Sequence, residues 1–358
     1  MVVKARGLSA ALLVCASLSA TAGAQDFFDR ITINGYTSFE FEKQLEKKGH
    51  GNGDPNGSFD ADGFDLVLNI HASERVRAAL DMALEHGVAT EDGRGNVAME
   101  YGFVEYTFSD MLKLRVGKMF TPFGVFNEIH TAKPAFLSVK EAASLNKNDR
   151  IIDGGFRFYP RWGAGIALHG DGVIGKKNFN YDVLLANGEQ ENTNPFEEDD
   201  NGFKSITARV RFEPSEDLRF GYSAYFDKLS DEKQARLVSN GLEFEWSHGS
   251  LRLLGELALG VLSPKSGTGI KQVAWYLQPS YHFRNGLTPY LRLDVLNLDS
   301  SKADDVGTLL VAGLNYELTK QCNVKVENNY FHGGKTTGLA TFPGRGYNEI
   351  KAAFVLGF

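Results

Sequence analysis

Apolar and polar residues alternate one by one along most of the chain. The stretch RITINGYTSFEFEKQ places Ile31, Ile33 and Phe39 on one side of an extended backbone and Glu40 on the other. A period of two is the geometry of a β-strand with one apolar face. The same alternation returns at intervals as far as the last residues, YNEIKAAFVLGF. The sequence therefore predicts an all-β protein.

Two observations bear on helices. The stretch RVRAALDMALEHG fits an amphipathic helix as well as a strand, but its alternating neighbours favour the strand. A mean hydropathy of -0.25 is low for a helical membrane protein. Outside the N-terminus, no apolar run reaches the roughly 18 residues that a transmembrane helix needs. Helical membrane spans are therefore excluded.

The N-terminal segment MVVKARGLSAALLVCASLSATAGAQ has the features of a secretory signal. Lys4 and Arg6 precede an apolar stretch, and the small residues Ala22 and Ala24 follow it. This order is typical of a cleaved signal peptide, and it fits better than a buried N-terminal helix. We expect residues 1–24 to be removed and residues 25–358 to form a single domain. The formal net charge of -7 disfavours nucleic acid as a partner.

The connections between the predicted strands alternate in length. Short ones, such as Ser73-Glu74 and Asn285-Gly286, lie between longer polar stretches such as ANGEQENTNPFEEDDNG. Short turns at one rim and long loops at the other are typical of a transmembrane antiparallel β-barrel, here of about 16 strands. The stretch 150–188 divides into strands in two ways, so counts of 14 and 18 stay open. The alternative is a soluble sandwich or lectin with one wet face.

The final stretch predicts the strand that closes the barrel. In lipid every backbone polar group needs an internal partner, so the first and last strands must pair. The row Ile350, Phe354, Leu356 and Phe358 would then face lipid beside Ile33. This end also resembles the C-terminal signal, ending in an aromatic residue, that the barrel-assembly machinery recognises. The resemblance implies that Phe354, Leu356 and Phe358 contribute to that signal.

One connection, TPFGVFNEIHTAKPAFLSVKEAASLNKNDRIID, is the third long one and far longer than an ordinary loop. Here the chain resembles the general diffusion porins, whose third outer loop folds into the lumen. The stretches FVEYTFSDMLKLRVGKMFTPFG and YDVLLANGE resemble the phosphate-selective porin O/P-like family of Gram-negative bacteria. The resemblance implies a homotrimeric outer-membrane pore for passive diffusion of small hydrophilic solutes or ions. Lipid and lipopolysaccharide would surround it.

Charged residues of the long loop and of the inward rows are the candidates for the pore. The candidates in the constriction loop are Glu128, His130, Lys133, Lys140, Glu141, Lys147, Asp149, Arg150 and Asp153. The candidates on the pore wall are Arg75, Arg77, Lys113, Arg115, Arg209, Arg211, Arg219, Arg252 and Arg292. The alternative for each is an ordinary solvated or salt-bridged wall residue. Acids share the same faces, so an anion preference stays open and phosphate specificity is not predicted.

Two other classes of function are weaker alternatives. An outer-membrane barrel enzyme of lipase or protease type would need a serine, histidine and acid brought together, and no local signature points to one. A non-conducting structural or adhesin barrel would share the same strand pattern. The eight histidines are scattered, with no spacing typical of metal ligands. We expect no catalytic site, no metal and no cofactor.

Overall fold

A computed structural model describes the barrel and much of its loops. The described residues are 30–45, 55–85, 96–129, 132–145, 157–188, 196–199, 201–229, 235–333 and 346–358. The predicted signal peptide, residues 1–24, therefore lies outside the described residues, and its cleavage stays a prediction.

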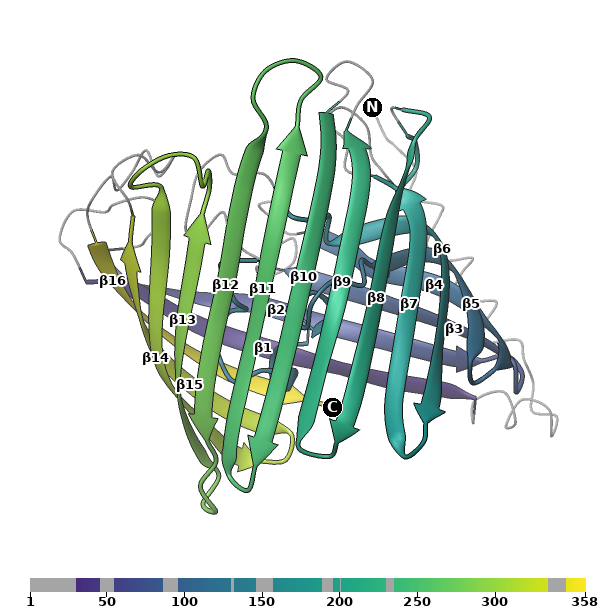
Figure 1. Ribbon diagram of the computed structural model, residues 1–358. Helices are drawn as coiled ribbons and strands as arrows, with labels where there is room; N and C mark the ends of the chain where they lie inside the picture. The colour runs from purple at the N-terminus through teal and green to yellow at the C-terminus, as the bar shows by residue number, and fades with distance from the viewer. Residues whose placement is uncertain are drawn as a thin grey trace, which may run out of the picture.

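Sixteen strands form one closed antiparallel barrel, in which each strand pairs with its neighbours in sequence and β1 pairs with β16 (Figure 1). The strands are Ile31–Gln44 (β1), Ser58–His71 (β2), Val76–Glu85 (β3), Asn96–Ser109 (β4), Leu112–Phe120 (β5), Trp162–Ile174 (β6), Lys177–Asn187 (β7), Lys204–Ser215 (β8), Leu218–Leu229 (β9), Ala235–His248 (β10), Leu251–Ser263 (β11), Ile270–Tyr281 (β12), Leu287–Asn297 (β13), Val306–Thr319 (β14), Cys322–His332 (β15) and Gly346–Gly357 (β16). The predicted all-β barrel is confirmed, with a count of 16 strands. Among the described residues, none forms a helix that is long and apolar enough to cross a membrane.

The stretch RVRAALDMALEHG contributes β3, so the strand interpretation is confirmed and the helical one is wrong. Its residues Val76–Glu85 pair along their length with β2 and β4, and these ladders satisfy the backbone groups that a helix would have paired internally. The proline that interrupts β12, Pro279, lies two residues before the strand ends, where a missing donor matters least.

Connections alternate in length around the barrel, as the sequence predicts. The even-numbered strands β2 to β14 lead into short turns at one rim, the lower rim in Figure 1. The longest connection joins β5 to β6 and comprises residues 121–161, which we call loop L3. It extends beyond the predicted end at Asp153, because Phe158 and Tyr159 are buried with the loop and do not belong to a strand. L3 contains a helical turn, Phe126–Ile129 (α3), and a 3-10 turn, Lys133–Ala135 (η1).

The predicted faces of the strands are also observed. In β1 the side chains of Ile33 and Phe39 are exposed on the outer surface, whereas Ser38 and Glu40 are buried toward the interior. Large apolar side chains are exposed on the outer surface of fifteen of the sixteen strands, all except β3. An apolar exterior of this extent is unfavourable in water and suits a hydrocarbon environment.

The seam between β1 and β16 closes the barrel at its last residues. Gly35 and Phe358 exchange two backbone hydrogen bonds, each 2.9 Å long. The Phe358 ring lies 5.8 Å from the ring of Phe64 on β2. A Cβ at position 35 would lie 2.7 Å from the Phe358 ring, so the close approach requires Gly35. Phe354 and Leu356 are exposed on the outer face, as expected for a lipid-facing row.

Aromatic pairs mark the rim of short turns. The rings of Tyr106 and Phe108 are 4.7 Å apart at the end of β4, and those of Tyr281 and Phe283 are 4.8 Å apart beyond β12. Phe108, Tyr281 and Phe283 are exposed on the outer surface. Amphipathic and aromatic rings at this height are typical of the interfacial girdle of a membrane barrel.

Candidate pore and its constriction loop

The described parts of loop L3, residues 121–129, 132–145 and 157–161, lie inside the barrel. Their polar groups contact side chains of β1, β2, β8, β11, β13 and β15. A single segment can reach strands on opposite sides of a closed barrel only through its interior. The predicted inward fold of the third long loop is therefore observed.

An apolar core anchors L3 to one half of the wall. The loop contributes Phe123, Val125, Phe126, Phe136, Ala142, Ala143, Leu145, Phe158 and Tyr159. The strands β9 to β15 contribute Tyr225, Leu237, Leu254, Ala258, Ala274, Tyr276, Tyr290, Leu296, Leu309, Val311 and Phe331. The interior face of these strands is thus apolar where the loop packs, and the described parts of L3 cover that side of the lumen.

A buried lysine of the wall binds the backbone of L3. The Lys325 ammonium, on β15, donates to the carbonyl oxygens of Lys133 at 2.6 Å, Phe136 at 2.5 Å and Ser138 at 3.1 Å. These three bonds use all three donors of the ammonium. Buried backbone carbonyls need hydrogen-bond partners. Lys325 supplies the donors for these three.

Arg292, a predicted pore-wall residue, is placed under the loop. Its guanidinium donates to the Ser138 hydroxyl at 2.8 Å and to the carbonyl oxygens of Lys140 at 3.3 Å and Glu141 at 3.2 Å. Asp294 compensates its charge at 2.7 Å. The residue is only 1% exposed, so in this structure Arg292 fixes the loop and does not face open lumen.

Acids of the wall accept the amides of L3. The acceptors are Glu256 for the Phe126 amide at 3.2 Å, Glu327 for the Val139 amide at 2.9 Å and Asp294 for the Ser144 amide at 3.1 Å. Hydrogen bonds to a charged acceptor are stronger than neutral ones, especially away from water. Carbonyls and amides of the loop are therefore both held by polar side chains of one wall.

The lysines predicted for the constriction are paired with acids on β1 and β2. Lys133 forms ion pairs with Glu40 and Asp62, and Lys140 bonds the same two carboxylates at 2.6 Å. Burial opposes the charged form of Lys140, but Glu40 and Asp62 outweigh it and raise its pKa above the usual range. This cluster is neutral overall and ties L3 to the first hairpin.

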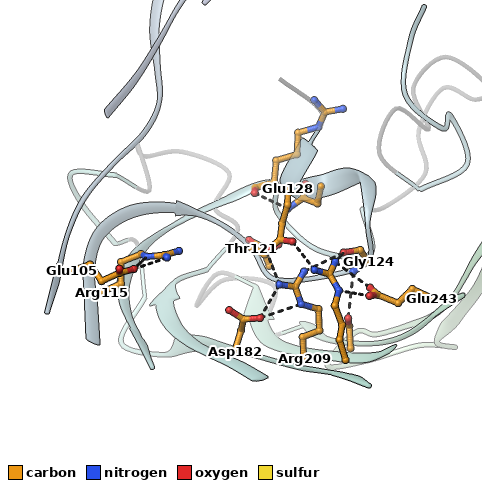
Figure 2. A network of polar contacts seen from close by, with 12 residues as sticks. Glu105, Arg115, Thr121, Gly124, Glu128, Asp182, Arg209 and Glu243 are labelled. Atoms are coloured by element: carbon orange, nitrogen blue, oxygen red, sulfur yellow. Dashed lines mark hydrogen bonds and ion pairs between the residues drawn. The ribbon is translucent and has the colours of Figure 1, made fainter. Parts of the chain in front are cut away.

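A third network holds the start of L3, and it is shown in Figure 2. Arg209 bonds one oxygen of Glu128 at 2.5 Å and Arg211 bonds the other at 2.9 Å. Both guanidiniums also donate to the Gly124 carbonyl, at 3.2 and 2.8 Å. Burial opposes ionisation of Glu128, but the two arginines overcome it and lower its pKa to about 2. Asp182 lies 2.7 Å from Arg209 and adds a further negative charge.

A different arrangement occurs on the wall of β3 to β6, which carries no part of the apolar anchor. Here one carboxylate, Glu105, accepts from Arg77 at 3.2 Å, Arg115 at 2.7 Å and His169 at 2.9 Å. The side chains of Arg77 and Arg115 are 32% and 24% exposed, far more than that of Arg209 at 3%. In Figure 2 the Glu105–Arg115 pair lies apart from the Arg209 network.

The open space adjoins these two arginines. A recess of about 240 Å³ is lined by Asn69, Arg77, Ala79, Tyr101, Phe103, Arg115, Met119, Phe120 and Glu128. A second recess, of about 410 Å³, lies toward the short-turn rim and shares Arg77 with the first. Both recesses therefore lie along the wall of β2 to β6.

Other predicted residues lie near the rims or outside the described residues. Arg75 and Lys113 line the larger recess, and Lys113 pairs with Asp171 at 2.8 Å. Arg219 and Arg252 both pair with Glu245 near the short turns. Glu141 pairs with Arg161 within L3. The candidates His130, Lys147, Asp149, Arg150 and Asp153 lie outside the described residues, and their roles stay predictions.

Several residues of the site were not among the sequence candidates. Lys325 and Glu327 hold the loop, and Asp62 anchors its lysines. Tyr101 and Phe103 line the recess although they are aromatic. The sequence could have identified them, because Tyr101, Phe103 and the inward-facing Glu105 are alternate residues of one strand and so point to the same face. Across the described chain, no group of three or more His, Cys, Asp or Glu residues is placed to hold a metal ion.

No protein-family model matches the chain. An uncharacterized protein of Aquifex aeolicus (strain VF5) is 23% identical to it over 248 residues, which are 64% of this chain and 52% of that protein. The chain thus spans about half the length of the curated relative that it matches.

Solved structures share the fold at low sequence identity. An anion-selective porin from Comamonas acidovorans has a TM-score of 0.66 and 13% identity, covering 92% of this chain and 99% of its own. OmpF of Salmonella typhi, in a complex with daunomycin, has a TM-score of 0.65 and 10% identity, covering 92% and 97%. OmpT of Vibrio cholerae, in its trimer form, has a TM-score of 0.58 and 11% identity, covering 92% and 99%. The fold is therefore that of the outer-membrane porins.

Proposed function

We propose that the protein is a channel of the bacterial outer membrane through which small hydrophilic solutes or ions diffuse passively. The observation that carries the proposal is the division of the lumen. The described parts of L3 cover the side beside β9 to β15, and recesses with charged walls follow β2 to β6. A closed barrel with an apolar exterior and a polar, partly open interior suits a selective aqueous pore.

Charge near the open recess favours anions. Arg77 and Arg115 share the single carboxylate of Glu105, so this cluster of three residues carries a positive excess. Fixed positive charge compensates an anion that leaves bulk water. The name of the Comamonas protein, an anion-selective porin, is consistent with this preference. Phosphate is the anion that the resemblance to the O/P-like family suggests, and the recordings described below test that narrower claim.

Targeting and assembly form a second part of the proposal. Residues 1–24 would direct export, and Phe354, Leu356 and Phe358 would present the signal to the barrel-assembly machinery. The mature barrel would then lie in lipid and lipopolysaccharide. We also propose a homotrimer, for which the trimer form of OmpT is the supporting precedent.

Planar-bilayer recording of the purified protein tests the channel proposal. We expect stepwise current increases on insertion, and a reversal potential in asymmetric KCl with the sign of an anion-preferring pore. Phosphate that blocks chloride current at low concentration would support the narrower claim. Silence under conditions where a known porin conducts would reject the channel and favour a structural or adhesin barrel.

A further inference from the structure

We propose that the recess on the wall of β3 to β5 is a binding subsite for small aromatic monocarboxylates, of which benzoate is the simplest. This inference rests on the proposed channel function and names a class of solute that the channel would favour. Two features of the recess support it. The first is an excess of positive charge from Arg77 and Arg115 over Glu105, and the second is a surface of aromatic side chains, which we call the floor of the recess.

The positive excess sets this wall apart from the charge networks that anchor L3. Arg77 and Arg115 face one acid, Glu105, so the three residues carry a formal charge of about +1. By contrast, Lys133 and Lys140 face two acids, Glu40 and Asp62, and are neutralised.

The described network at the start of L3 offers no comparable excess, whereas Arg219 and Arg252, near the short turns, also share one acid, Glu245. Arg209 and Arg211 face three acids, namely Glu128, Asp182 and Glu243. In the Glu105 cluster two guanidiniums are both partly exposed, and both line a recess. Planar guanidiniums bind carboxylates through paired N–H donors.

The floor of the recess is apolar and aromatic, which is unusual for the wet face of a pore wall. The ring of Tyr101 stacks on that of Phe103 at 5.7 Å and meets Phe120 edge-on at 5.3 Å. Phe103 also packs against a small apolar cluster that includes Met119 and Leu184. Packing holds these aromatic rings in place, and without a bound solute their surface in the recess would face water. A solute ring would cover that surface.

Stacking orients the two arginines toward the recess. The Arg115 guanidinium carbon lies 4.2 Å from the centre of the Phe103 ring, and that of Arg77 lies 5.5 Å from it. Opposite Phe103 stands Gly117, where a Cβ would lie 2.8 Å from the Phe103 Cα. Glycine therefore leaves space for the ring beneath the guanidiniums. A guanidinium that is already stacked loses less freedom when it binds a carboxylate.

Access and size fit a single-ring acid. The recess of about 240 Å³ continues through Arg77 into the larger recess at the short-turn rim. On the loop side it ends at Glu128, whose two oxygens are occupied by Arg209 and Arg211. One excess positive charge matches one carboxylate, and the aromatic floor accepts the ring.

Two measurements test the subsite on the purified full chain. In planar bilayers, benzoate should reduce chloride current at about one tenth of the concentration that acetate needs, because the ring adds apolar contact. Isothermal titration calorimetry on the detergent-solubilised barrel should give the same ratio without requiring conduction. Benzyl alcohol, which lacks the charge, should neither block nor bind measurably.

Variants assign the effect to the recess. Arg115→Gln should weaken benzoate binding about tenfold, the value expected for one lost charged hydrogen-bond partner. Arg115→Lys should recover part of that loss, since the charge returns without the planar fork. Phe103→Leu should reduce the benzoate-to-acetate ratio. The matched control is Lys177→Gln, because Lys177 also lies over a ring, that of Phe212, but at the exposed β6–β7 turn.

The outcomes separate the two proposals. If the protein binds benzoate selectively in calorimetry but conducts no current, the channel function fails and the subsite stands. If it conducts while benzoate and acetate act equally, or while phosphate binds more tightly than benzoate, the subsite is refuted and the channel stands. A Lys177→Gln effect equal to that of Arg115→Gln would also refute the subsite.

Discussion

At the scale of single residues, Gly124 illustrates how the start of L3 depends on backbone conformation. Gly124 has a φ of +64°, and a Cβ at this position would collide with the carboxylate of Glu256. Its carbonyl oxygen is the common acceptor for Arg209 and Arg211. Both the left-handed backbone and the missing side chain are therefore needed for the loop to lie against the wall.

We predict that Gly124→Ala releases the start of L3. Single-channel recordings should show larger and noisier currents, and the barrel should unfold at a lower temperature in detergent. Gly175→Ala is the matched control, because Gly175 has a φ of +68° with no atom close enough to crowd a Cβ. The control should cost only the backbone strain, about 1 kcal/mol. Equal effects of the two variants would contradict the role of the contact with Glu256.

Glu128 gives a pH-dependent prediction. Its pKa falls from 4.5 to about 2, after the two arginines overcome the effect of burial. A carboxyl with a lowered pKa stabilises the folded state fully above its unfolded pKa, and this contribution is lost as the pH falls through the folded pKa. The difference in unfolding temperature between wild type and Glu128→Gln should therefore be constant from pH 7 to about 5. It should shrink toward zero near pH 2. A difference that already vanishes at pH 4 would contradict the assigned ion pairs.

At the scale of elements, L3 behaves as a bound segment of the barrel. Lys325 and Arg292 hold five of its carbonyl oxygens, and acids of the same wall accept its amides. Phe126 packs edge-on against Tyr276 at 5.4 Å, which adds apolar contact to these polar bonds. The described parts of the loop therefore pack as part of the barrel interior, unlike an ordinary surface connection, and their position determines how much of that interior they occupy.

We predict that Lys325→Met detaches the middle of L3. Removing a buried cation leaves three carbonyl oxygens without their donor, and losses of this kind cost about 3 kcal/mol or more. Single-channel conductance should increase and thermal stability should fall. Lys113→Met is the matched control, because its pair with Asp171 is largely exposed. Exposed pairs contribute about 1 kcal/mol at most, so the control should change stability little. Unchanged conductance in Lys325→Met would show that the loop is held without this lysine.

At the scale of the whole molecule, closure depends on the seam between β1 and β16. The two hydrogen bonds between Gly35 and Phe358 are the last of this ladder, and the Phe358 ring rests beside Phe64. An open edge would leave unpaired backbone groups in lipid, at a cost of several kcal/mol each. The last residue pair of the β1–β16 ladder therefore contributes more to the stability of this barrel than terminal residues contribute to a soluble domain.

We predict that deleting Phe358, or Phe358→Asp, lowers the amount of heat-modifiable folded barrel in the outer membrane while export to the periplasm continues. The measurement is the shift in gel mobility of boiled and unboiled membrane fractions. Phe283→Asp is the control, because Phe283 is an exposed aromatic at the same rim but away from the seam. Charges near the interface cost little in a barrel, about 0–1 kcal/mol. Normal assembly of the Phe358 variants would remove the proposed assembly role.

Much of the architecture was determined by the sequence itself. Alternation predicts strands and their faces, and the alternating lengths of the connections predict a barrel, because both are local properties of the chain. The alternation also predicts that Glu40, Glu105 and Arg292 point into the barrel and that the row ending at Phe358 points outward, as the structure shows.

Only the tertiary structure decided what each inward charge does. Arg77 and Arg292 have the same parity and chemistry, yet one borders a recess and the other is buried under L3. Lys133 and Lys140 look like constriction residues in the sequence, but they pair with Glu40 and Asp62 on the first hairpin. These pairings join residues far apart along the chain, and they follow from where L3 docks. Periodicity reports which face a side chain occupies, whereas only the folded barrel determines which partner meets it there.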